Sequence, residues 1–229
     1  MKLAQYFHRL MVTLYTTFNA VMIYLFLLNL PFGYEPFAAT LIHWDEIEGI
    51  GSVAATAVIA AVAGMLLVVR LGAEWKNALS YFSVKLGHPA CTVFMTTRRQ
   101  PFDSAAVLKA YPAVKESAFA PDVQFQVWES VYRKHAGNTL IMSTRAYWHL
   151  LRDLYFLSVF YLGIFLVVWA LKWGVPFVIS SPYVFVFGAQ ALFLLLSVRK
   201  VGYRFVDNVL ATDIGLKPGE TAEPKKTRR

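Results

Sequence analysis

Four long apolar runs dominate the pattern of hydrophobic and polar positions. They cover about residues 10–30, 50–69, 154–172 and 183–198. Apart from Lys172 at the end of the third, the runs contain no Asp, Glu, Lys, Arg or His. Runs of this length suit α-helices that cross a bilayer. The first run is too long to be the apolar core of a signal peptide, so we interpret it as an uncleaved transmembrane span.

The segments between the runs differ in charge. Residues 31–48 contain four acidic residues and no Lys or Arg, and of the 22 Lys and Arg residues only Lys172 falls in a segment that we place outside. Loops on the cytoplasmic side carry an excess of Lys and Arg. This distribution predicts two hairpins of spans, residues 1–69 and 154–198, with both termini cytoplasmic.

The connection between the hairpins, residues 70–153, is long enough for a small cytoplasmic domain. We expect helices over 103–110, which Asp103 would cap, and over 122–135, followed by one unbroken helix from 138 to 173. We also expect the second span to continue inward with one apolar stripe, and residues 91–95 to be extended. That stripe is Leu71, Trp75, Leu79 and Phe82. The fold class is therefore an all-α membrane protein with four transmembrane helices in a 2+2 arrangement and a small, mainly helical cytoplasmic domain.

Residues 199–229 form the last expected region. An amphipathic helix to about residue 212 would place Val201, Phe205 and Val209 on its apolar side and Asp207 on its polar side. After it, residues 216–229 are rich in Pro, Gly and Lys/Arg and are predicted to be a disordered basic tail next to anionic lipid.

Composition agrees with a membrane protein. The chain has 57% hydrophobic and 16% charged residues, and its mean hydropathy is +0.48, whereas soluble domains contain about 25% charged residues. The formal charge of +8 follows the expected cytoplasmic segments, so we predict no nucleic-acid partner. With one cysteine, Cys91, the chain has no internal disulfide.

Three groups of residues are candidates for packing or binding. Small residues at spacing four on the second span form a helix-packing face for either the first span or another subunit. Polar residues of the first span should face other helices. Basic residues just before the third span could contact an anion or a lipid headgroup, although ordinary juxtamembrane charge explains them too. In chain order these groups are the polar face Thr13, Thr16 and Asn19, the small-residue ladder Ser52, Thr56, Ala60 and Gly64, and the collar Arg145, His149 and Arg152.

No catalytic, cofactor or metal motif is visible. His88 and Cys91 lie three residues apart, but two ligands do not make a metal site. The pair Arg98–Arg99 is typical of a solvated loop. Phosphate-binding loops, zinc-protease helices and Gly-x-Ser-x-Gly turns are absent from the sequence. The sequence therefore predicts no enzyme, no cofactor and no metal.

Three stretches carry a resemblance. The motifs LGHPAC from Leu86, WESVYRKH from Trp128 and LLRD from Leu150 resemble a pattern in uncharacterised bacterial inner-membrane proteins that have two spans, a cytoplasmic insert and two more spans. The resemblance covers about residues 70–200. The architecture is also similar to membrane subunits of antiphage systems.

From these features we expect a non-enzymatic protein of the bacterial inner membrane. It would act as a sensor, effector or scaffold, with its cytoplasmic domain coupled to the spans, as a homo-oligomer and with a possible cytoplasmic protein partner. Two alternatives stay open. One is a passive channel or transporter that uses the polar face of the first span. The other is a membrane anchor subunit for a soluble enzyme.

Overall fold

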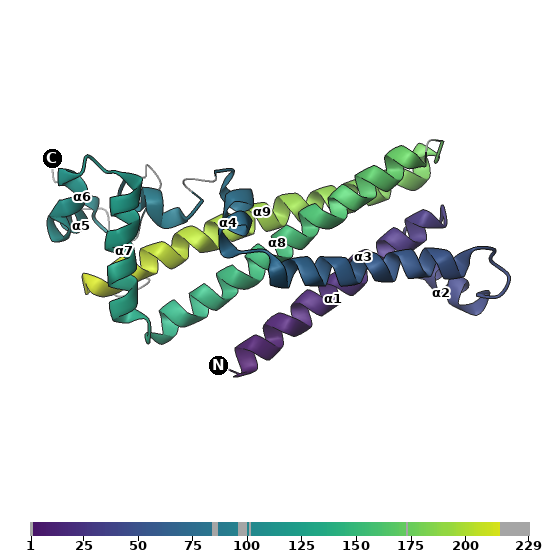
Figure 1. Ribbon diagram of the computed structural model, residues 1–229, viewed down its shortest axis with the longest axis horizontal. Helices are drawn as coiled ribbons and strands as arrows, with labels where there is room; N and C mark the ends of the chain where they lie inside the picture. Colours follow the sequence, from purple (N-terminus) through teal and green to yellow (C-terminus); the bar gives the residue numbers. More distant parts are fainter. Residues whose placement is uncertain (1, 84–86, 96–99, 101, 173, 216–229) are drawn as a thin grey trace, which may run out of the picture. The chain divides into compact units, whose positions relative to one another are not determined.

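The computed structural model, drawn in Figure 1, describes residues 2–83, 87–95, 100, 102–172 and 174–215. All regular secondary structure in these ranges is helical, which confirms the all-α class. The elements in chain order are α1 (Lys2–Leu27), α2 (Tyr34–Ile42), α3 (Ile50–Arg70), α4 (Ala73–Tyr81), the 3₁₀ helix η1 (Pro89–Met95), α5 (Ser104–Ala110), α6 (Pro112–Glu116), α7 (Pro121–His135), α8 (Thr139–Leu171) and α9 (Phe177–Asp213).

Four of these helices are long and apolar enough to cross a membrane, as expected. They are α1 from Ala4, α3, α8 and α9. Helices α8 and α9, with 33 and 37 residues, are about 50 and 55 Å long at the usual rise. A hydrocarbon core is only about 30 Å thick. The apolar run of α9 stops before Arg199. The last turns of α9, up to Asp213, therefore lie beyond the segment that would cross a membrane.

The chain divides into two compact units. The first, here called the span unit, contains Met1–Gly72 and Leu150–Leu196; the second, the insert unit, contains Ala73–His149 and Ser197–Arg229. The sequence pattern treats residues 199–229 as a region of their own, whereas the structure groups α9 from Ser197 onward with the insert. Helices α8 and α9 each contribute a segment to both units.

The span unit has a core of large aromatic and aliphatic side chains. Helix α1 packs against α3 (Figure 1), and the ring of Phe26 lies 4.9 Å from Phe165 and 5.2 Å from Tyr183. The Tyr183 hydroxyl donates a hydrogen bond to the Leu30 carbonyl oxygen at 2.8 Å. Since lipid is as apolar as these side chains, close packing of this kind is what holds spans together.

The insert unit is built around the last turns of α9. Every residue from Phe205 to Ala211 is buried, so this helix is enclosed on all sides. The sequence pattern puts Asp207 on an exposed side, but its side chain is buried and accepts a hydrogen bond from Gln100 Nε2 at 3.2 Å. Within this unit α7 packs against α6 and η1, and α5 packs against α6 and η1 (Figure 1).

Two local predictions are wrong. The second span does not continue inward, because Leu71 is extended (ψ 127°) and Gly72, a poor helix former, follows it. Helix α4 then begins anew, and it buries Lys76, Asn77 and Ser80 while Trp75 is exposed. Residues 91–95 are also not extended: they belong to η1, which starts at Pro89, where the fixed φ favours a helical turn.

Other local predictions are confirmed. The Asp103 carboxylate accepts a hydrogen bond from the Ala105 backbone N–H at 3.0 Å and caps α5. Helix α7 ends at His135, and α8 is one unbroken helix from Thr139 to Leu171. The predicted basic tail, residues 216–229, and the pair Arg98–Arg99 lie outside the described residues.

Candidate functional site

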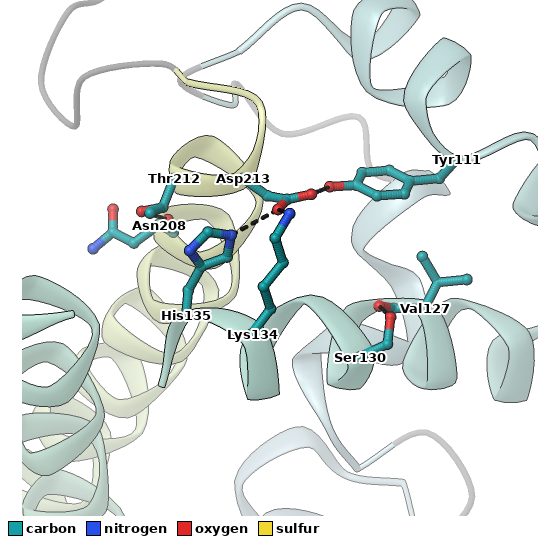
Figure 2. A network of polar contacts seen from close by, with 8 residues as sticks. All are labelled: Tyr111, Val127, Ser130, Lys134, His135, Asn208, Thr212 and Asp213. Carbon is teal, nitrogen blue, oxygen red and sulfur yellow. Dashed lines mark hydrogen bonds and ion pairs between the residues drawn. The ribbon is translucent and has the colours of Figure 1, made fainter. Parts of the chain in front are cut away.

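A well-connected polar site in the insert unit surrounds Asp213, the last residue of α9. Its carboxylate accepts hydrogen bonds from the Tyr111 hydroxyl at 2.6 Å and from Lys134 Nζ at 2.7 Å, and His135 Nε2 lies 2.6 Å away. Figure 2 shows Tyr111 approaching one side of the carboxylate, with Lys134 and His135 on the other. We call these four residues the Asp213 junction.

Local sequence explains why these groups meet. Lys134 and His135 occupy the last turn of α7, where the helix dipole favours basic side chains. Tyr111 is the single residue between α5 and α6. The junction thus fastens the end of α9 to α7 and to the α5–α6 corner, two neighbouring segments that are far from Asp213 in the sequence.

Electrostatics at the junction favour an ionised Asp213. Burial alone would raise the pKa of its carboxyl group, but hydrogen bonds from Lys134, Tyr111 and His135 hold that pKa well below the usual value. The pKa of Tyr111 is raised, first by burial and then by its hydrogen bond to Asp213. A carboxylate that stays charged near neutral pH and is surrounded by donors is suited to holding helices together, and it is not poised to exchange a proton at that pH.

Three further hydrogen bonds hold α9 along its length within the insert unit. Arg199 Nε donates to the Ser80 carbonyl oxygen at 2.7 Å, and Trp128 Nε1 donates to the Val206 carbonyl oxygen at 3.3 Å. Asn208 Nδ2 donates to the Thr144 hydroxyl oxygen at 3.3 Å. The partners come from α4, α7 and α8, so α9 is the common support of the unit.

His88 lies in an aromatic cluster of the same unit. Its ring centroid is 4.9 Å from Trp128, 5.1 Å from Phe125 and 5.4 Å from Trp148. A neighbouring open cavity of about 400 Å³ is lined by His88, Cys91 and others. Burial raises the pKa of the Cys91 thiol, which is the opposite of what a cysteine nucleophile requires.

No group of three or more His, Cys, Asp or Glu side chains is arranged to hold a metal ion anywhere in the described ranges. The pair His88 and Cys91 therefore acquires no third ligand there. Phe125, Trp128 and Tyr132 of α7 form packing contacts: the Trp128 and Tyr132 rings contact Phe205 at 5.5 and 5.8 Å.

The collar residues fall in both units. In the insert unit, Arg145 is exposed; its Nε lies 3.3 Å from His149 Nε2, and its guanidinium group stands over the Tyr132 ring at 5.5 Å. In the span unit, Arg152 is only 6% exposed. Protein therefore encloses the Arg152 side chain. Of these two arginines, Arg145 is the one that an anion in solvent can reach.

The small-residue ladder and the polar face meet inside the span unit. Ala60 and Gly64 are buried, whereas Ser52 and Thr56 are exposed. A Cβ atom at Gly64 would lie 3.1 Å from the Tyr161 hydroxyl. That hydroxyl is close enough to Thr16 to interact with it. The ladder therefore packs against α8 of the same chain at Gly64.

The three residues of the polar face differ in burial. Thr16 and Asn19 are fully buried, and Thr13 is exposed. Asn19 Nδ2 donates to the Tyr15 carbonyl oxygen at 2.8 Å. The side chains of Tyr15, Asn19 and Ser158 lie close together. Two of the three predicted residues thus belong to a buried polar cluster between α1 and α8.

The sequence reasoning missed two important residues. His8 Nε2 lies 3.2 Å from Asp153 Oδ2 and ties α1 to α8 in the span unit, and Asp213 organises the insert unit. Both partnerships join residues far apart in the chain, so no local spacing marks them. A weak signal existed for Asp213: it is an acidic residue at the end of an apolar helix segment, where basic residues are preferred.

Comparison with protein-family models, with curated proteins and with solved structures finds no match for this chain.

Proposed function

We propose that this chain is a non-enzymatic integral protein of a bacterial inner membrane that acts as a sensor and effector. The insert unit is cytoplasmic, both termini are cytoplasmic, and a ligand or partner bound to the insert alters the spans. Charge supports this topology: exposed Glu35 lies in α2, exposed Asp45, Glu46 and Glu48 follow it, and Lys and Arg concentrate in the insert.

The observation that carries the proposal is the double role of α9. Its first half is a candidate membrane-spanning helix, and its second half is the enclosed support of the insert unit. A partner that favours a different arrangement of α4, α7 and α8 around α9 would act on a helix that continues into the span unit. Differential binding to two arrangements is what a conformational switch requires.

Gly202 offers a precise way to disturb this arrangement. A Cβ atom there would lie 2.7 Å from Trp148 Nε1 and would also clash with the Tyr81 hydroxyl. Gly188 lies on the same helix and has no such neighbour within 4 Å. Gly202→Val therefore disrupts the packing of the insert on α9, and Gly188→Val is a matched substitution in the apolar half.

The test measures membrane potential in cells that express the full chain, Gly202→Val, Gly188→Val, or a chain with residues 120–137 replaced by a flexible linker. Membrane amounts are matched. We expect the full chain and Gly188→Val to depolarise the cells, and the other two to lose the effect. Depolarisation that survives the linker replacement would instead indicate a channel formed by the spans alone.

The anchor alternative gives a different result in the same strains. No depolarisation by any variant, together with a soluble enzyme that co-purifies in fixed ratio with the full chain but not with Gly202→Val, would replace the effector proposal. The buried positions of Thr16 and Asn19 mean that a pore along the polar face requires rearrangement of α1 and α8.

A further inference from the structure

An apolar groove runs along the span unit where α1, α2 and α3 meet. Its volume is about 340 Å³, within the range of small-ligand sites. The groove is lined by Val21 and Ala20 of α1, by Phe37 and Leu41 of α2, and by a stripe of α3. Small residues of α3, above all Ala54, Ala57 and Ala61, leave the space that forms it.

The groove is about as long as half of a hydrocarbon core is thick, and its lining is centred midway along α3. Along α3 its lining extends from Ala54 to Met65, eleven residue steps or about 17 Å at the helical rise. Half of a hydrocarbon core is about 15 Å. Val58 and Val62 on this stripe are 60% and 51% exposed, so the groove opens sideways to where lipid chains lie.

One end of the groove carries a hydrogen-bond donor. Tyr24 lines the groove three residues before the end of α1, and its side chain is only 6% exposed. Its hydroxyl is buried and has no hydrogen-bond partner among the described residues. Such a group is stabilised by a ligand that brings an acceptor.

Acidic residues follow the last α2-side lining residue of the groove in the chain. Trp44, which lines the groove, is followed by exposed Asp45 and Glu46 and then by Glu48. Of these, Glu46 pairs with His43 at 3.1 Å. Negative charge beside the mouth of the groove repels an anionic headgroup and attracts an ammonium group.

We propose that this groove binds one acyl chain of a phosphatidylethanolamine molecule. The ester carbonyl of the chain accepts a hydrogen bond from the Tyr24 hydroxyl, and the chain lies along α3 toward Met65. The ammonium group of the lipid faces the carboxylates that follow Trp44. This lipid site goes beyond the proposed function and does not depend on what binds the insert unit.

The test uses the full chain in nanodiscs that contain a trace of phosphatidylethanolamine with a photoactivatable group in its acyl chain. After irradiation, the labelled peptides are identified and quantified by mass spectrometry. We expect labels on α3 between Ala54 and Met65 and on the facing turns of α1. Phosphatidylglycerol with the same photoactivatable chain should label these peptides at least three-fold less.

Three variants test the groove itself. Val62→Trp fills it and should lower labelling of these peptides about ten-fold, whereas Ile59→Trp, an exposed position on α3 outside the groove, should leave labelling unchanged. Tyr24→Phe keeps the ring contact with Phe37 and should lower labelling about five-fold, the effect of one hydrogen bond.

Several outcomes would overturn the proposal. Equal labelling of Val62→Trp and Ile59→Trp would show that the chain does not occupy the groove. Equal labelling by the two lipids would remove the headgroup assignment, and crosslinks from groove residues to a second copy of the protein would show that the groove is a subunit interface.

Discussion

The hydroxyl group of Tyr161 lies directly over Gly64. A Cβ atom at Gly64 would be 3.1 Å from this oxygen and 3.2 Å from atoms of both Leu157 and Phe160. All three neighbours belong to α8. The missing side chain is therefore what allows α3 and α8 to approach in the span unit, as small residues do between spans generally.

Replacing Gly64 with Leu should destabilise the span unit. The added side chain has to displace three α8 side chains, and such overpacking typically lowers stability by about 1–3 kcal/mol. The measurement is the thermal unfolding midpoint in detergent. Gly163→Leu is the control, because Gly163 on α8 is exposed and has no such neighbour within 4 Å. An equal loss from both variants would contradict the importance of this contact.

The proposed topology predicts which loops reach each side of the membrane. In a Cys91→Ala background, Glu46→Cys and Arg133→Cys each provide a single thiol at sites with side-chain exposure of 70% and 74%. A membrane-impermeant maleimide should label Glu46→Cys in spheroplasts and label Arg133→Cys only after lysis. Since exposure is matched, the difference reports sidedness. The reverse pattern would invert the topology and place the insert outside the cytoplasm.

The Asp213 junction predicts a pH dependence of the insert unit. The folded-state pKa of Asp213 lies below its usual value, so its contribution to stability is present above an unfolded pKa of about 3.9 and is lost as the pH falls below it. The pKa of Tyr111 is raised, so its contribution is present below about pH 10 and is lost above it.

Hydrogen exchange of the amides of residues 205–213 tests this dependence. Protection, corrected for intrinsic exchange rates, should be constant between about pH 5 and pH 9 and fall on either side. Asp213→Asn should reduce protection within the plateau by about 1–3 kcal/mol, because a charged acceptor with three donor side chains around it is lost. Arg133→Ala, which removes an exposed pair with Glu129, should change it by less than about 0.5 kcal/mol. Equal effects would contradict a special role for Asp213.

Local features of the sequence predicted local features of the structure. The apolar runs determine four long helices because a single segment satisfies its own backbone hydrogen bonds in hydrocarbon only as a helix. The Asp103 cap depends on neighbours two residues apart. The break at Leu71–Gly72 was missed because apolar spacing continues through it. Helical period alone does not reveal that α4 buries Lys76 and Asn77.

The site contacts could not be read from one chain. His8–Asp153, Tyr111–Asp213 and Tyr161–Gly64 each join residues about 100 or more positions apart. These contacts form only when the helices pack against one another, so the spacing of residues in the sequence does not predict them. The ladder and the polar face were visible as motifs, but their contact with α8 depended on Tyr161 and Ser158, which the pattern did not mark.

The collar gives the last prediction, because its two arginines have different surroundings. Arg145 is exposed beside His149, and Arg152 is 6% exposed. A buried guanidinium group is stable only with polar partners around it. Arg152→Met leaves the polar groups around the guanidinium group without their donor, so it should lower stability by about 1–3 kcal/mol. Arg145→Met leaves exposed groups that water can solvate and should change stability by less than about 1 kcal/mol. Denaturant unfolding in detergent measures the stability of both variants.

Vesicles that contain phosphatidylglycerol test whether the collar binds an anionic headgroup. If Arg145 contacts a phosphate headgroup, Arg145→Met should weaken association with these vesicles while stability is kept. Unchanged binding by Arg145→Met, with Arg152→Met as stable as the parent chain, would show that the collar is ordinary juxtamembrane charge.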